Sequence, residues 1–141
     1  MQDKYILAII AVLSLIGIGL SSYLTEAHYA LSEESFCDIN AQVSCTAVNT
    51  SVYSELFGIS VALLGVIWFL AIFGMAFLHW RGKHTHKWMV FWSVSGVAFV
   101  GYLILAEILL RAFCILCTSA HIIVLLILAL TILLYRNKPS L

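Results

Sequence analysis

The last apolar run of the chain, AFCILCTSAHIIVLLILALTILLY at residues 112–135, decides the fold and carries the first sign of the chemistry. It contains no Asp, Glu, Lys or Arg. As a helix rising about 1.5 Å per residue, it is long enough to cross the roughly 30 Å hydrocarbon core of a bilayer. Cys114 and Cys117 stand near its start. Thiols at i and i+3 lie on one face of a helix, one turn apart, so they can share a disulfide or pass one on.

The start of this helix also affects the chemistry of the first thiol. Unpaired N–H groups and the helix macrodipole favour a thiolate at Cys114. Two other interpretations of the pair stay open, because half of a zinc site has the same spacing and free cysteines are common as small core residues. His121 follows Cys117 by four residues on the same helical face. Its imidazole can donate a hydrogen bond to a ligand carbonyl, or only satisfy a neighbouring helix.

The composition excludes a soluble protein. Of the 141 residues, 63% are hydrophobic and 10% are charged, and the mean hydropathy is +1.07. A soluble domain is far more charged. We therefore expect a single transmembrane domain over residues 1–141, with room for one compact bundle and none for an appended soluble domain.

Four apolar segments predict an all-α, polytopic membrane four-helix bundle, with spans at about 5–24, 56–79, 88–107 and 112–135. The first segment is too long for the apolar core of a signal peptide, and no Ala-x-Ala-like cleavage site follows it, so we expect it to be retained. Glu107 and Arg111 mark a very short connection before the last span, in the favourable i, i+4 order for a helical ion pair. The only sizeable loop runs from Thr25 to Glu55.

The basic residues predict the orientation of the bundle. Four spans put both termini on one side of the membrane, together with the turn between the second and third spans. Six of the seven basic residues then share that side: Lys4, Arg81, Lys83, Lys87, Arg136 and Lys138. An inner aromatic belt is expected there too, from Tyr5, Trp80, Trp88 and Tyr135. The positive-inside rule makes this side cytoplasmic.

The predicted topology places all four cysteines at the extracytoplasmic face of the cell membrane, where disulfides persist. The loop at 25–55 carries the other two cysteines, Cys37 and Cys45, and we expect Cys37 to be an exposed thiol. This loop contains no Lys or Arg, and its acidic residues are Glu26, Glu33, Glu34, Asp38 and Glu55. A partner protein is therefore expected to dock by apolar contact rather than by charge steering.

Two dithiol pairs at one membrane depth indicate electron transfer by disulfide exchange. A fixed structural disulfide between Cys37 and Cys45 is the main alternative. A zinc site requires four ligands, and His28 is the one further candidate near the loop. The solvated interpretation is preferred for His84 and His86 in the basic turn. Plain packing is preferred for the mid-span aromatic residues Trp68 and Trp92, although they are also placed to line an apolar pocket.

Taken together, these motifs resemble the vitamin K epoxide reductase family. The resemblance is carried by FCDINAQVSC at residues 36–45, Ser51, LFGI at 56–59 and CILC at 114–117, and it covers nearly the whole chain. It implies a four-helix bundle that holds a quinone beside the Cys-x-x-Cys pair, under a loop that bears the other two cysteines. The analogous DsbB oxidases carry their Cys-x-x-Cys in the first outer loop, whereas here it comes last, which favours the resemblance to the vitamin K epoxide reductase family.

The resemblance also implies a role for each site residue. Cys117 is the thiol that reacts with a quinone of the menaquinone or ubiquinone type. Cys114 exchanges with the loop, Cys45 pairs with Cys114, and Cys37 reacts with the external redox partner. Other matching positions are Asp38 and Ser51 near the site, Ser54 or Glu55 as a hydrogen-bonding group for a quinone carbonyl, and His121, where animal members have a tyrosine.

The implied function is that of a quinone-dependent thiol-disulfide oxidoreductase that supports disulfide bond formation, with no metal and no nucleic acid involved. Many prokaryotic members carry a fused thioredoxin-like domain, which is not found in this sequence. We therefore expect a separate extracytoplasmic thioredoxin-like (DsbA-like) protein as the electron donor. The first alternative is the reverse reaction, in which external thiols drive the reduction of a quinone or vitamin K epoxide. The second is a non-enzymatic metal-binding membrane subunit.

Overall fold

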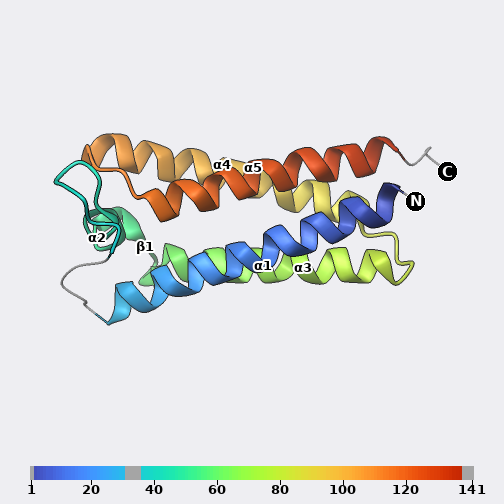
Figure 1. Ribbon diagram of the computed structural model, residues 1–141, viewed down its shortest axis with the longest axis horizontal. Coiled ribbons are helices and arrows are strands. Elements are labelled where there is room, and N and C mark those ends of the chain that lie inside the picture. Colours follow the sequence, from blue (N-terminus) through green and yellow to red (C-terminus); the bar gives the residue numbers. More distant parts are fainter. Residues whose placement is uncertain (1, 31–35, 138–141) are drawn as a thin grey trace.

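Four long helices make up the computed structural model, which describes residues 2–30 and 36–137. They are α1 (Gln2–Tyr29), α3 (Val61–Trp80), α4 (His86–Leu110) and α5 (Ile115–Arg136). Each is long and apolar enough to cross a membrane. They run side by side along the long axis of the molecule (Figure 1). The prediction of an all-α, polytopic membrane bundle is confirmed.

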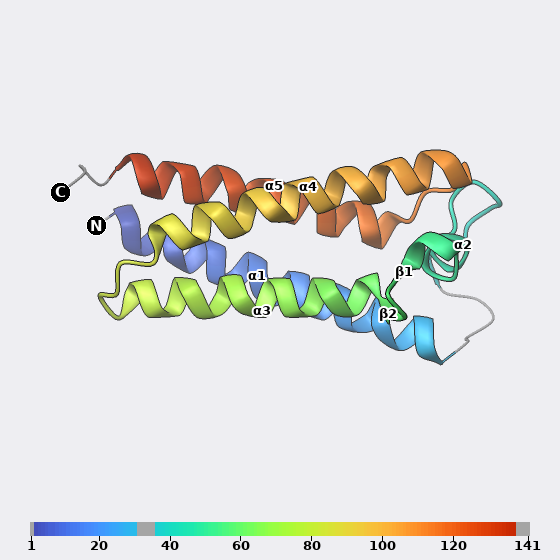
Figure 2. The same ribbon diagram turned by 180° about the vertical axis from the view of Figure 1, so that it is seen from behind.

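The helices pack as two pairs. α1 has its most extensive contact with α3, and α4 with α5, while α1 also contacts α5. α3 and α4 touch least among these neighbours, although Figure 2 shows them side by side from behind. Fully buried side chains from all four helices form the core, and the largest are Ile10, Ile72, Met89, Ile127 and Leu134.

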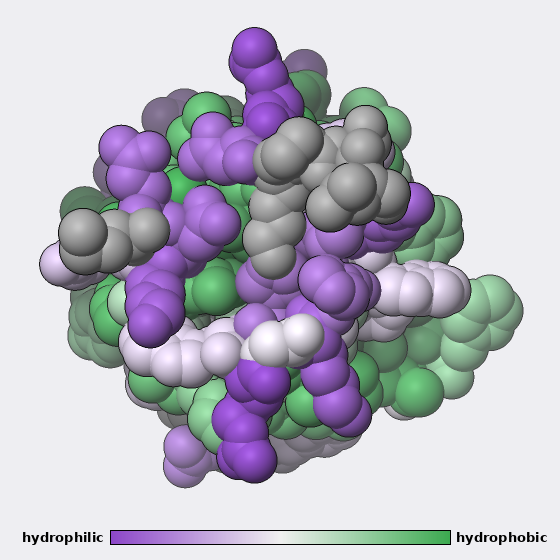
Figure 3. Space-filling view, turned by 90° about the vertical axis from the view of Figure 1, so that its right-hand side faces the viewer, coloured by the Kyte–Doolittle hydropathy of each residue, from purple (hydrophilic) through white to green (hydrophobic). Residues whose placement is uncertain are grey.

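Both termini lie at one end of the bundle, together with the turn that joins α3 to α4 (Figure 1). Viewed from this end, the surface is mostly hydrophilic, with apolar helix sides behind it (Figure 3). The expected aromatic belt residues are all exposed: Tyr5, Trp80, Trp88 and Tyr135. Lys138, which also belongs to this end in the prediction, lies outside the described residues.

The segment expected as a loop contains helical structure after α1. It forms a short helix, α2 (Cys45–Asn49), and a 3₁₀ helix, η1 (Val52–Ser54). Ser44 caps α2, because its hydroxyl accepts a hydrogen bond from the backbone N–H of Ala47. Glu33 and Glu34, part of the acidic character expected of this loop, lie outside the described residues.

The predicted start of the second span, residue 56, is wrong. Strands β1 (Glu55–Leu56) and β2 (Ile59–Ser60) pair as a tight hairpin before α3 begins. Phe57 and Gly58 occupy its turn with φ values of +54° and +78°. Two consecutive positive φ angles are the signature of a two-residue hairpin turn, which a continuing helix cannot accommodate. Ser60 then caps α3 by accepting a hydrogen bond from Ala62 N–H.

The bounds of the other three spans also shift. α1 extends beyond the predicted 5–24 at both ends, and α4 beyond the predicted 88–107. α4 ends at Leu110 because Arg111 adopts a left-handed conformation with φ +52°. α5 begins at Ile115, three residues later than predicted, because Cys114 is its N-cap. The expected helical pair of Glu107 and Arg111 is wrong, since the described residues show no ion pair between them: Glu107 is buried and Arg111 is exposed beyond the helix end.

Candidate active site

The first cysteine of the Cys-x-x-Cys pair caps helix α5. The Sγ of Cys114 accepts a hydrogen bond of 3.2 Å from the backbone N–H of Cys117. The Cys117 thiol also donates to it, and this bond is the largest cause that lowers the pKa of Cys114 below that of an ordinary thiol. Backbone N–H groups of Cys117 and Leu116 act in the same direction, and the three hydrogen bonds together outweigh burial and the charge of Glu107, which raise the pKa. The thiolate expected at the helix start is therefore favoured, although Cys114 is fully buried.

The two loop cysteines form a disulfide, Cys37–Cys45, while Cys114 and Cys117 are free thiols. Both disulfide partners are buried, with 4% and 1% of their surfaces exposed. The prediction that Cys37 is exposed is therefore wrong in this state of the protein.

All four cysteines belong to a single apolar cluster. Leu24 is buried with Cys37, Cys45 and Cys114, and Cys117 packs against this group. A parallel β-bridge between Val43 and Phe113 brings the two pairs together, two residues before Cys45 and one before Cys114. The bridge has two hydrogen bonds, from Ser44 N–H to Phe113 O at 3.0 Å and from Phe113 N–H to Gln42 O at 2.7 Å. Residues far apart in the sequence thus place the loop disulfide beside the thiols of α5.

Asp38 organises the segment between the loop cysteines. One carboxylate oxygen accepts from the Ser44 hydroxyl at 2.8 Å and from Thr46 N–H at 3.0 Å, and the other accepts from the Thr46 hydroxyl. These bonds join the residue after Cys37 to the residues on either side of Cys45. Asp38 therefore positions the start of α2 and, with it, the buried disulfide.

An apolar cavity of about 430 Å³ lies next to the sulfur cluster. Its walls come mainly from α3 and α4, with contributions from the loop and from α5. Cys117 and His121 both line it, so the predicted common face of these two residues opens onto the cavity. His121 is 6% exposed, and its Nε2 atom has no hydrogen-bond partner within the described part of the chain. A buried nitrogen without a partner is costly unless a ligand completes it.

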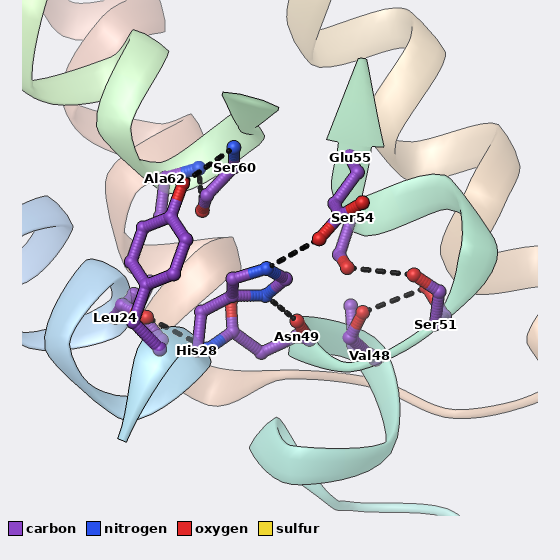
Figure 4. A network of polar contacts seen from close by, with 10 residues as sticks. Leu24, His28, Val48, Asn49, Ser51, Ser54, Glu55, Ser60 and Ala62 are labelled. Atoms are coloured by element: carbon purple, nitrogen blue, oxygen red, sulfur yellow. Dashed lines mark hydrogen bonds and ion pairs between the residues drawn. The ribbon is translucent and has the colours of Figure 1, made fainter. Parts of the chain in front are cut away.

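A polar network fixes the loop to the helix bundle (Figure 4). His28 contacts the carbonyl oxygen of Asn49 through Nδ1 at 2.6 Å and the carboxylate of Glu55 through Nε2 at 3.0 Å. The Asn49 side-chain amide donates to Leu24 O at 2.8 Å. The network joins the end of α1 to α2 and β1, so the loop is fixed to the bundle at more than one point.

The loop residues predicted near the quinone separate into two groups. Ser51 and Ser54 line the cavity, and the Ser54 hydroxyl donates to Ser51 O at 2.6 Å. Glu55 is not among the residues that line the cavity; its carboxylate contacts His28 (Figure 4), and about half of its side chain is exposed. The chain turns at this point into β1, which is why adjacent residues face different surroundings.

Plain packing was the preferred interpretation for Trp68 and Trp92, but both line the cavity, which was the alternative. They form reciprocal hydrogen bonds of 3.2 Å, each indole N–H donating to the backbone carbonyl of the other residue. Two other cavity residues were missed by sequence reasoning: Asn49 of the loop and Glu107 of the last turn of α4. Nothing in the sequence distinguished Glu107 from a surface acid, because its burial depends on where α4 ends.

Across residues 2–30 and 36–137, no group of three or more His, Cys, Asp or Glu side chains is placed to hold a metal ion.

The model of one protein family matches the chain. It is described as the Vitamin K epoxide reductase family, and the match covers residues 8–132. This range includes both cysteine pairs, the loop and His121.

Proposed function

Because the chain belongs to the vitamin K epoxide reductase family, and is thus a membrane oxidoreductase, we propose that it passes electrons from an external thioredoxin-like protein to a membrane quinone. The electrons enter at Cys37/Cys45 and leave from Cys114/Cys117. The products are an oxidised partner and a quinol, so the reaction supports disulfide bond formation. Direction is set by the reduction potentials of the partner and the quinone.

The observation that carries this proposal is the single buried cluster that contains all four cysteines and borders an apolar cavity. Disulfide exchange requires a thiolate to attack a disulfide sulfur, so successive sulfurs must approach one another. The Val43–Phe113 bridge holds the two pairs in adjacent segments. A quinone is an apolar two-electron acceptor that dissolves in the bilayer, and a cavity bounded by α3 and α4 suits such a substrate.

In the proposed sequence, a partner thiolate attacks Cys37 and frees the Cys45 thiolate. Cys45 attacks Cys114 of an oxidised Cys114–Cys117 pair and frees Cys117. The partner's second thiol then releases the oxidised partner, and Cys37 displaces Cys114 from Cys45. The loop disulfide is thereby restored, and both thiols of α5 are reduced. This is the state of the present structure. Two electrons and two protons then pass from Cys114 and Cys117 to the quinone.

The proposed quinone contacts are His121 and Ser54, with Cys117 as the reacting thiol. All three line the cavity, and the Nε2 atom of His121 is available to a ligand carbonyl. Glu55 is not included, because its carboxylate accepts from His28 outside the cavity wall. Asp38 is given a positioning role, since its hydrogen bonds hold the segment between the loop cysteines.

We place the cysteine end outside the cytoplasm. The distribution of basic residues supports this orientation, because the end that holds both termini also holds Arg81, Lys83, Lys87 and Arg136. The partner is then an external, DsbA-like protein. Exposed apolar side chains beside the buried disulfide, Phe36, Ile39 and Phe113, are consistent with docking by apolar contact. Tags on the two termini should be protected in sealed right-side-out cells, whereas a probe inserted in the loop should be accessible.

The function is tested by mixing purified protein with a reduced thioredoxin-like protein and a soluble quinone analogue, and following quinol formation. The wild type is expected to oxidise the partner and form quinol in equal amounts. Cys117→Ser should abolish quinol formation while the remaining thiols still exchange with the partner. Partner oxidation without quinol, or normal quinol formation by Cys117→Ser, would contradict the assigned roles.

A further inference from the structure

The end of α4 places a buried carboxyl group against the Cys-x-x-Cys pair. Glu107 is 3% exposed and lines the same cavity as Cys117 and His121. Its carboxyl group accepts a hydrogen bond from the backbone N–H of Cys114. Its Oε1 atom is buried and has no hydrogen-bond partner among the described residues. A buried carboxyl group is costly, and the one hydrogen bond from Cys114 leaves its Oε1 atom unsatisfied.

Quinone reduction requires a group that moves protons from the two thiols to the quinone oxygens. When Cys114 and Cys117 reduce a quinone, two thiols lose their protons and two quinone oxygens gain them. The thiols must reach the thiolate form to react, yet Cys114 is fully buried, so bulk water does not reach it. Of the described residues that line the cavity, Glu107 is the one with a carboxyl group.

We infer that Glu107 is the proton carrier between the Cys114/Cys117 thiols and the quinone oxygens; this rests on the proposed quinone reduction. The Glu107 carboxylate takes a proton from one thiol and, as the acid, delivers it to one quinone oxygen. A second pass moves the proton of the other thiol to the second oxygen. The two sulfurs become a disulfide, their electron pair reduces the quinone, and Glu107 returns to its starting form.

Glu107→Gln is the direct test, because the amide keeps the size of the side chain and an acceptor for Cys114 N–H but does not carry a proton. Protein reduced at Cys114 and Cys117 would be mixed rapidly with a quinone analogue. Since positioned acid-base groups contribute about 10²- to 10⁴-fold to rates, quinol formation should slow by about that factor. Quinone Kd and the rate of exchange between the two cysteine pairs should change less than about twofold. Glu26→Gln, which alters an exposed carboxylate of α1, is the matched control.

Two other roles predict different results. A carboxylate charge beside the thiols opposes their ionisation, so a purely electrostatic Glu107 predicts faster quinone reduction in Glu107→Gln. A purely structural Glu107 predicts a lower melting temperature and slower disulfide exchange as well. Either result would overturn the inference.

A second variant tests the carrier role without the amide side chain that Glu107→Gln introduces. Glu107→Ala opens space beside Cys117 that formic acid is small enough to enter, and added formate should restore quinol formation at least tenfold. Absence of rescue in a folded Glu107→Ala protein that still binds quinone would refute the carrier role. If the wild type itself forms no quinol while its cysteine pairs exchange normally, the proposed function fails instead, which separates the two hypotheses.

Discussion

Replacing His121 with phenylalanine should weaken quinone binding without lowering the stability of the ligand-free protein. The imidazole is 6% exposed, its Nε2 atom has no partner within the described residues, and it shares a cavity wall with Cys117. A quinone packed against the Cys117 sulfur brings a carbonyl near this nitrogen, because i and i+4 side chains are neighbours on a helix. Phenylalanine keeps a ring in the wall but removes the donor.

The size of each effect follows from the interactions that His121→Phe removes from the quinone complex and from the free protein. In the complex, an unpaired quinone carbonyl in a dry cavity costs about 1–3 kcal/mol, which corresponds to a Kd or KM raised roughly 5- to 100-fold. In the free protein, the substitution removes a buried nitrogen that has no partner, so it removes a cost rather than an interaction. The melting temperature of the ligand-free protein should therefore stay the same or rise.

The assay measures quinone KM, quinone Kd and melting temperature on one preparation, with His121→Gln as the control that keeps an N–H donor in the cavity wall. His121→Gln should lie closer to the wild type than His121→Phe in quinone affinity. Exchange between the cysteine pairs should be unaffected in both variants. An unchanged KM in His121→Phe, or a loss of stability with no loss of affinity, would refute the reasoning and return His121 to a packing role.

Three further predictions concern other parts of the site. Cys37→Ser should block oxidation of a protein partner but spare turnover with a small dithiol, since a small dithiol needs a smaller displacement of the loop than a folded protein does to reach a buried Cys45–Cys114 bridge; equal loss with both reductants would contradict the entry role. Cys117→Ala removes the thiol that donates to Cys114, so the pKa of Cys114 should rise and its thiolate absorbance should appear at higher pH than in Cys117→Ser, where a hydroxyl still donates. Gly96→Ala should destabilise the bundle by about 1–3 kcal/mol, because an added Cβ lies 2.5 Å from the Trp68 ring; Gly101→Ala, with open space in the same helix, is the control and should not lower the melting temperature.

The helices and their number were predictable because the membrane imposes a simple rule. Every backbone polar group in the hydrocarbon core must be satisfied within the chain, so long apolar runs are helices. The same regularity placed Cys117 and His121 on one face. It did not predict where helices end, because ends depend on individual caps and turns. Ser60, Cys114 and the left-handed Arg111 shift the bounds of α3, α5 and α4.

The parts of the site that were not predicted depend on contacts between distant segments. The burial of Cys37 follows from a β-bridge between residues that are 70 positions apart, Val43 and Phe113. Glu107 was read as part of a short connection, yet it faces the cavity because α4 continues past it to Leu110. Hydrophobic periodicity describes one segment at a time, whereas the burial of Cys37 and of Glu107 depends on how several segments pack together. The resemblance between cysteine motifs supplied the residues of the site, but not the wall that they share.

The loop from Phe36 to Glu55 performs two tasks that the structure makes inseparable. It carries the disulfide that a partner must reach in the proposed reaction, and through Asn49, Ser51 and Ser54 it forms part of the cavity wall. Because Cys37 is only 4% exposed, a protein partner must displace this loop to attack its sulfur. Displacement strains the contacts that His28 makes with Asn49 and Glu55, which fasten the loop to α1. The same movement opens the part of the cavity wall that the loop forms and admits water to the cavity. Partner oxidation and quinone reduction are therefore expected to occur in different loop positions. Quinone reduction is expected in the closed position, the one in this structure, where the loop excludes water from the cavity.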